Sequence, residues 1–273
     1  MAQLFKSDLL SGKVALITGG GTGLGFATAH QYVKLGAKVV LVGRRSEPLA
    51  DAQDKLGLAA TWHQADIREA EGAQAAVQAA LDTHGRLDLL VNNAGGQYFV
   101  PAELIEAKGW HAVWRLNVGA TDRMCRFAHQ LWMAERGGTI INITLSPHHG
   151  LPGMAHSSSA RAAVEALTGE LATQWGSSNI TVCAVAAGHF ATDALNKYPE
   201  PVKRGVAQTV PLGRLGEPVE HAQLMALLAS PLGAALSGQT ITLDGARDNW
   251  FGPWPPTSLT DASGDVPTEA RKQ

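Results

Sequence analysis

Five glycines within residues 18–25 stand where a chain could hold a phosphate group. The segment follows an apolar run over 14–17, which predicts a buried strand, and precedes a helical pattern over 26–35. A glycine-rich turn between a strand and a helix lets a pyrophosphate approach the backbone and sit on the helix N-terminus. We therefore predict a dinucleotide-binding turn, with contacts from Thr18, Gly19, Gly21, Thr22, Gly23, Leu24 and Gly25.

The end of the second predicted strand indicates which dinucleotide binds. An NAD-selective site usually has a carboxylate here for the ribose 2′-hydroxyl, whereas this chain has Arg44 and Arg45, whose guanidinium groups suit a 2′-phosphate. We therefore predict NADP(H), with a solvated pair of turn residues as the alternative. After the third predicted strand, Asp66 could accept from the adenine amino group beside Ile67, or cap a helix over 67–71.

Strand-like and helix-like segments alternate along the chain. Apolar runs predict strands over 14–17, 38–42, 60–64, 87–92, 139–144, 181–185 and 240–243, with alanine-rich amphipathic stretches such as 70–84 and 160–175 between them. This alternation predicts one α/β domain, a doubly wound parallel sheet with helices on both faces. The domain is predicted to span 1–249, followed by a Trp/Pro-rich tail over 250–273 with a mobile polar end.

The amino-acid composition limits which binding partners and which cellular compartment we expect for this protein. The 273 residues carry a net charge of −2 and no basic run longer than two residues, so we expect no nucleic acid partner. The only cysteines, Cys125 and Cys183, fit a reducing compartment and offer no metal-binding spacing. The chain shows no signal-peptide pattern and no apolar run of about 18 residues. We expect a cytoplasmic protein with a small-molecule ligand, no bound metal and no membrane partner.

Further motifs after the glycine turn carry a family resemblance. They are 92–95 (Asn-Asn-Ala-Gly) after the fourth predicted strand, Asn117 in a helical segment, 211–214 (Pro-Leu-Gly-Arg), and Asp244-Gly245 near the end. With these motifs, the chain over about residues 10–248 resembles the short-chain dehydrogenase/reductase family. The resemblance implies a Rossmann fold, a nicotinamide cofactor and a homotetramer or homodimer. It implies a proton-relay role for Asn117, and cofactor contacts from Asn93, Ala94, Gly95, Gly188 and Thr192.

The catalytic positions depart from the family pattern. Where the family has a Ser and a Tyr-x-x-x-Lys, the resemblance places Thr144, Ser157 and Arg161. A serine hydroxyl is a much weaker acid than a tyrosine assisted by a lysine, so it mainly donates a hydrogen bond. Arg161 stays charged and could still contact the ribose hydroxyls. Cofactor positioning is therefore expected to survive, whereas the proton source is open.

Conjugate reduction demands less of a proton donor than carbonyl reduction does. Hydride addition to an enoyl thioester leaves an enolate, a weaker base that nearby donors can stabilise. The segments 92–98, 101–103, 108–113 and 156–161 resemble the peroxisomal trans-2-enoyl-CoA reductase branch, which shares the arginine, and the dienoyl-CoA reductases also lack the usual tyrosine. The enoyl reductase branch has a catalytic tyrosine where this chain has Glu165, so no donor transfers by resemblance.

Other side chains could supply the proton. His148, His149 and His156 flank the predicted centre and titrate near neutrality, although histidines in an exposed loop are the simpler interpretation. Tyr98 is a second candidate, or else a packing aromatic. Trp110 and Trp114, one helical turn apart, favour core packing or a subunit interface.

Three hypotheses follow. The first is an NADP(H)-dependent oxidoreductase acting on an enoyl thioester or a related conjugated acyl substrate, in lipid metabolism. The second is an alcohol dehydrogenase or carbonyl reductase acting on an apolar, terpenoid-like substrate, because the tail over 248–256 resembles those of bacterial citronellol or citronellal dehydrogenases. The third is a cofactor-binding protein with little catalysis.

Overall fold

The computed structural model describes residues 4–146, 148, 150–193, 195 and 205–250. Its centre is one seven-stranded sheet in the order β3-β2-β1-β4-β5-β6-β7, with every neighbouring pair parallel. The strands are β1 (Val14–Thr18), β2 (Lys38–Gly43), β3 (Ala60–Gln64), β4 (Leu89–Asn92), β5 (Gly138–Leu145), β6 (Ile180–Ala187) and β7 (Thr240–Leu243). This confirms the predicted single-domain, doubly wound α/β fold.

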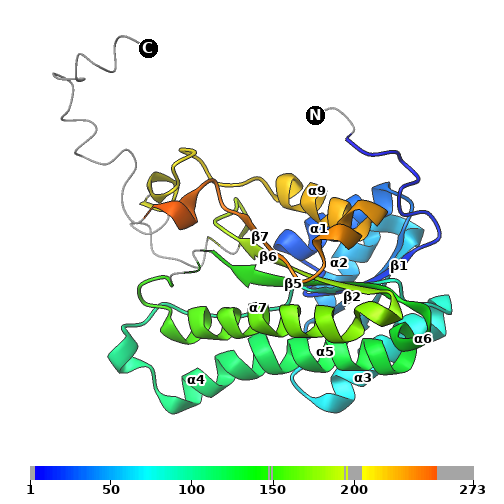
Figure 1. Ribbon diagram of the computed structural model, residues 1–273, viewed down its shortest axis with the longest axis horizontal. Coiled ribbons are helices and arrows are strands. Elements are labelled where there is room, and N and C mark those ends of the chain that lie inside the picture. The colour runs from blue at the N-terminus through cyan, green and yellow to red at the C-terminus, as the bar shows by residue number, and fades with distance from the viewer. Residues whose placement is uncertain (1–3, 147, 149, 194, 196–204, 251–273) are drawn as a thin grey trace, which may run out of the picture.

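Helices cover both faces of the sheet (Figure 1). On one face lie α1 (Gly23–Lys34), α2 (Ser46–Leu56) and α9 (Pro218–Ala229). On the other lie α3 (Ala70–His84), α4 (Ala107–Trp114), α5 (Ala120–Ala128), α6 (Ala134–Arg136) and α7 (Ala155–Trp175). Among the described residues, no helix is both long enough and apolar enough to span a bilayer.

The strands are apolar on both sides because both sides are covered. In β1, Ala15 and Ile17 belong to the core beneath α1 and α9, while Val14 and Leu16 belong to the core beneath α3 and α5. All four side chains are at most 3% exposed. A strand buried on both faces reads as a continuous apolar run rather than an alternating one, which is why this strand could be predicted from sequence.

Helix starts are the main departure from the sequence prediction. The helix α3 and the strands β3 and β7 have the predicted bounds. The helix α1 begins at Gly23 rather than at residue 26, and α7 begins at Ala155, one residue before the start that the family resemblance places at His156. At α1, small residues that look like part of the glycine turn form the first helical turn. Ser157 lies in the first turn of α7, and its side chain is buried.

Candidate active site

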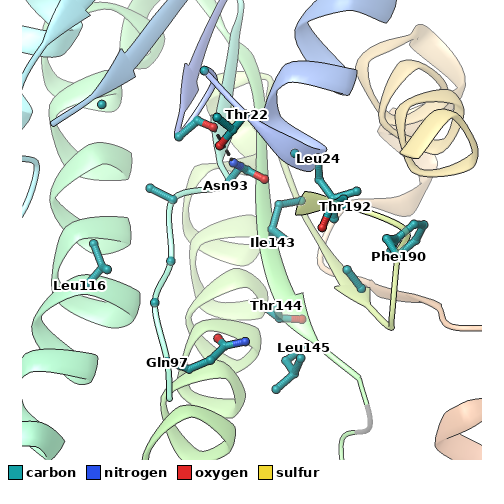
Figure 2. A pocket seen from close by; sticks show the side chains of 18 of the residues that line it. Thr22, Leu24, Asn93, Gln97, Leu116, Ile143, Thr144, Leu145, Phe190 and Thr192 are labelled. Carbon is teal, nitrogen blue, oxygen red and sulfur yellow. Dashed lines mark hydrogen bonds between the residues drawn. The ribbon is translucent and has the colours of Figure 1, made fainter. Parts of the chain in front are cut away.

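A cavity of about 820 Å³ opens at the carboxyl ends of the strands. Its walls come from β2, β5 and β6 and from the segments that follow β1, β3 and β4, so it includes the point between β1 and β4 where the strand order reverses. Ligands of open parallel sheets bind at such a point. Figure 2 shows Thr22, Leu24 and Thr192 at one end of the cavity and Gln97, Thr144 and Leu145 at the other.

Most of the sequence-predicted residues line this single cavity. The lining includes Gly19, Gly21, Thr22, Gly23, Leu24, Arg44, Arg45, Asp66, Ile67, Asn93, Ala94, Gly95, Thr144, Arg161, Gly188 and Thr192. The other four predicted residues, Thr18, Gly25, Asn117 and Ser157, are buried behind the wall. Each of these four supports a residue or a turn that does reach the cavity.

The glycine turn is held by close backbone packing. Gly19 has a φ of +67°, and a Cβ at Gly25 would lie 2.4 Å from the Gly19 carbonyl oxygen and 2.6 Å from Asn93 Nδ2. Asn93 Nδ2 donates to the carbonyls of Thr18 and Gly19 at 3.0 and 3.3 Å. The Thr18 hydroxyl accepts from the backbone N–H of Asn93 and Ala94 at 3.1 and 3.0 Å. The turn and the segment after β4 therefore form one rigid unit.

This unit leaves the first turn of α1 facing the cavity. The helix begins at Gly23, and its N-cap residue Thr22 makes no side-chain capping hydrogen bond. The first N–H groups of a helix lack partners within the helix and carry its positive dipole end. The turn can therefore bind an anion such as a pyrophosphate.

Arg44 and Arg45 line the cavity beyond the end of β2, next to Asp66. Both carboxylate oxygens of Asp66 accept from Arg68, whose Nε lies 2.8 Å from Oδ1 and whose Nη2 lies 2.5 Å from Oδ2. This hydrogen-bonded pairing lowers the pKa of Asp66 to about 2. The alternative in which Asp66 caps a helix over 67–71 is wrong, because α3 begins at Ala70 with Glu69 at its N-cap.

Asn117 and Ser157 each hold a residue of the segment after β4. Asn117 lies in a π-helical turn (Arg115–Gly119) between α4 and α5, and its side chain accepts from the Gly96 N–H at 3.1 Å and donates to the Gly96 carbonyl at 2.9 Å. The Ser157 hydroxyl donates to Gln97 Oε1 at 3.4 Å. Because the amide oxygen faces Ser157, the amide nitrogen of Gln97 points toward β5 (Figure 2).

Arg161 is a buried cation at the centre of the wall. Its Nη1 donates to the Ile143 carbonyl at 2.6 Å, and burial lowers its pKa to about 10. A Cβ at Gly95 would lie 1.9 Å from Nη2, so the absence of a side chain there makes room for the guanidinium. Nε has no hydrogen-bond partner among the described residues, which leaves a buried donor near the cavity.

Thr144 connects the cavity to a cluster of ionisable side chains, of which the sequence suggested only His148 as a proton donor. Thr144 Oγ1 donates to Glu165 Oε1 at 2.8 Å, and that oxygen lies 3.3 Å from His148 Nε2. His148 Nδ1 in turn lies 2.7 Å from Asp248 Oδ2. Burial raises the pKa of the Glu165 carboxyl, while the Thr144 hydrogen bond and the His148 charge oppose the increase.

A second carboxylate fixes the segment that carries Asp248. Asp244 Oδ2 accepts from the Asp248 N–H at 2.7 Å and also from the buried Ser146 hydroxyl. Glu165 could have been suspected from its position one helical turn after Arg161. No local signal joins His148 to Asp248, which is 100 residues away.

The other suggested proton donors lie elsewhere. His156 is fully buried within α7 with its ring edge-on to Tyr98 at 4.5 Å between centroids, so the exposed-loop interpretation is wrong for it. Burial lowers the His156 pKa. Tyr98 is outside the cavity lining, with its hydroxyl against Gly109. His149 and the tail beyond Trp250 lie outside the described residues.

Comparison with known proteins agrees with this architecture. The family described as enoyl-(acyl carrier protein) reductase matches residues 19–246. A peroxisomal 2,4-dienoyl-CoA reductase of Arabidopsis thaliana is 35% identical over 260 residues, covering 90% of this chain and 87% of the relative. A probable 2,4-dienoyl-CoA reductase of Bacillus subtilis is 36% identical over 254 residues, covering 89% and 98%.

A solved structure gives the same result. A citronellol catabolism dehydrogenase of Pseudomonas aeruginosa superposes with a TM-score of 0.81 at 37% identity, over 90% of this chain and 98% of that one. The chain therefore belongs to the short-chain dehydrogenase/reductase family of oxidoreductases. It is similar both to dienoyl-CoA reductases and to the citronellol catabolism enzyme.

Proposed function

We propose that this protein is an NADP(H)-dependent oxidoreductase that reduces conjugated enoyl thioesters, including 2,4-dienoyl thioesters. The observation that carries the proposal is the composition of the cavity. The glycine turn and two arginines form one end, and Gln97, Thr144 and apolar side chains such as Phe99 and Met154 form the other. The described lining contains neither a tyrosine nor a lysine.

The residues at the glycine-turn end suit a dinucleotide phosphate. The exposed first turn of α1 would hold the pyrophosphate, and Arg44 and Arg45 would hold a 2′-phosphate. Arg161 keeps a free N–H donor near the cavity, which suits a ribose hydroxyl or a nicotinamide amide oxygen. A bound reduced nicotinamide supplies a hydride to the conjugated acyl group.

The reaction end suits an enolate better than an alkoxide. Conjugate reduction leaves an enolate oxygen that hydrogen-bond donors can stabilise without a strong acid. The Gln97 amide nitrogen, oriented by Ser157, is a donor at this end, and Thr144 lies on the facing side with its hydroxyl donating to Glu165. The apolar lining excludes water and accepts an acyl chain.

The direct test is cofactor oxidation, followed by absorbance, with a series of thioesters. We expect NADPH oxidation with trans-2-enoyl-CoA and 2,4-dienoyl-CoA substrates, and much slower oxidation with 3-oxoacyl-CoA of the same chain length. NADH tested in parallel examines the cofactor assignment separately. No turnover of any conjugated thioester would contradict the proposal.

The similarity to a citronellol catabolism dehydrogenase supports a second candidate function. An apolar cavity end would also accept a terpenoid alcohol, and its oxidation would reduce NADP. Citronellol with NADP, compared with trans-2-enoyl-CoA with NADPH, distinguishes the two candidates. Sustained alcohol oxidation without thioester reduction would favour the second.

We further propose a cytoplasmic homo-oligomer. Trp110 on α4 is 36% exposed, and a large aromatic side chain at the surface of a helix suits a subunit interface. Light scattering of the purified protein measures the assembly directly, and a monomeric mass would contradict the proposal.

A further inference from the structure

Thr144, Glu165, His148 and Asp248 form a continuous row from the cavity wall to the surface. Thr144 is 3% exposed and lines the cavity, whereas the side chains of Glu165, His148 and Asp248 are 20%, 27% and 18% exposed. We propose that His148 and Asp248 are positioning residues that return protons from solvent to Glu165, from which the Thr144 hydroxyl protonates the substrate. The proposal rests on the proposed reductase function.

Hydrogen bonding fixes where the protons of this row lie. An ionised carboxylate only accepts, so His148 Nδ1 carries a proton toward Asp248 Oδ2 at 2.7 Å. The backbone N–H of His148 donates to the other oxygen of Asp248 at 2.6 Å, which fixes the loop as well as the ring. With Nδ1 protonated, Nε2 faces Glu165 Oε1 at 3.3 Å. One proton can occupy that gap, on the nitrogen or on the carboxyl.

The proton transfer balances along the row. When the α-carbon of the enolate is protonated, the Thr144 O–H bond breaks and the enolate electron pair forms the new C–H bond. The Glu165 carboxyl proton passes to the Thr144 oxygen in the same step, so no free alkoxide forms. His148 Nε2 then takes a proton from solvent and passes it to Glu165, which restores the starting state with one proton between the two groups.

The surrounding charges are compatible with this sequence. Partial burial raises the pKa of the Glu165 carboxyl, so Glu165 holds a proton more readily than an exposed carboxyl does. Asp248 adds to this increase, and His148 opposes it. The other ionisable groups of the described residues near the row are Asp244, Arg247, Arg161 and His189.

The first test replaces the imidazole. In H148Q, kcat for enoyl thioester reduction should fall at least about 10-fold, while KM and the Kd for NADPH change less than about twofold, because general-acid function is lost without loss of binding. Added imidazole should restore part of the activity of H148G but none of that of E165Q. H111Q, a histidine substitution on α4, is the matched control and should match the wild type.

The second test changes the carboxylate behind the imidazole. In D248N the basic limb of the kcat profile should move to lower pH, because the Asp248 charge that helps to raise the Glu165 pKa is removed. D122N, a substitution on the exposed α5 surface, should leave the profile unchanged. Wild-type kcat and an unshifted profile in both H148Q and D248N would overturn the proposal.

A measurement without substrate separates this inference from the proposed function. In isotopically labelled protein, the His148 Nδ1–H proton should give a downfield NMR signal that is lost in D248N and retained in D122N. If the wild type reduces no conjugated thioester but shows this signal, the proposed function fails while the hydrogen-bonded row stands. If the signal is absent or insensitive to D248N, the row itself is wrong.

Discussion

The two ends of the cavity are held by different kinds of contact. At the β1–α1 end, backbone groups of the glycine turn pack against the segment after β4, through Asn93 and the Thr18 hydroxyl. At the β5–α7 end, side chains join distant segments, as Ser146 does with Asp244 across 98 residues and His148 with Asp248 across 100. A backbone scaffold tolerates few residue types, whereas a side-chain network can change its chemistry while the fold is kept.

The largest predicted effect tests the backbone end. In G25A the new Cβ would overlap the Gly19 carbonyl, at 2.4 Å, and should abolish measurable NADPH binding by deforming the turn. G176A is the matched control, because a Cβ there meets nothing within 4 Å. Fluorescence titration gives the Kd, and thermal unfolding shows whether the fold survives. Normal NADPH affinity in G25A would contradict the view that close backbone packing shapes the glycine-turn end of the cavity.

The next prediction tests the reaction end without touching the row of ionisable groups. Q97L should lower kcat for thioester reduction about 100-fold, the usual loss when one oxyanion donor is removed. S157A should lower it only a few-fold, because the amide is then misoriented rather than absent. Steady-state kinetics with Q174L as the control check this order. A larger loss in S157A than in Q97L would contradict the orienting role.

A smaller effect on cofactor binding is expected at Arg44, which lines the cavity beyond the end of β2. R44A should raise the Kd for NADPH about 10-fold, because one charge-assisted hydrogen bond to the 2′-phosphate is lost. The Kd for NADH should stay within about twofold of the wild-type value. R136A, which removes a guanidinium stacked on Trp132 at 4.2 Å, is the control. Equal changes for the two cofactors in R44A would refute a 2′-phosphate contact.

The smallest effect is a pH dependence of stability. The raised pKa of Glu165 means that the folded protein keeps this proton to higher pH than the unfolded chain, whose carboxyl has a pKa of 4.5. This contribution to the free energy of unfolding is complete below 4.5 and is lost as the pH rises through the folded pKa. E165Q should remove that slope, which for one proton is at most about 1.4 kcal/mol per pH unit. Urea unfolding across this range, with E170Q as the control, measures it.

Sequence prediction was most successful where contacts are local. The strands and the glycine turn are encoded by apolar runs and glycines within a few neighbours, and 16 of the predicted site residues do line one cavity. It was weaker at α1, where residues 23–25 proved to be helix, and at His156, which is buried within α7. The helical start depends on packing against the sheet, which propensity alone does not report.

The sequence by itself determined a doubly wound sheet with a dinucleotide turn. Apolar runs and amphipathic stretches alternate at the spacing of strands and helices, and the glycines of the turn lie within a few residues of one another. Only the tertiary structure showed that Gln97 is oriented by Ser157, and that Thr144, Glu165, His148 and Asp248 meet beside the cavity. Thr144, His148, Ser157 and Glu165 belong to the β5–α7 unit, whereas Gln97 follows β4 and Asp248 follows β7. Their proximity follows from strand order and from the path of the chain after β7, which no local pattern specifies.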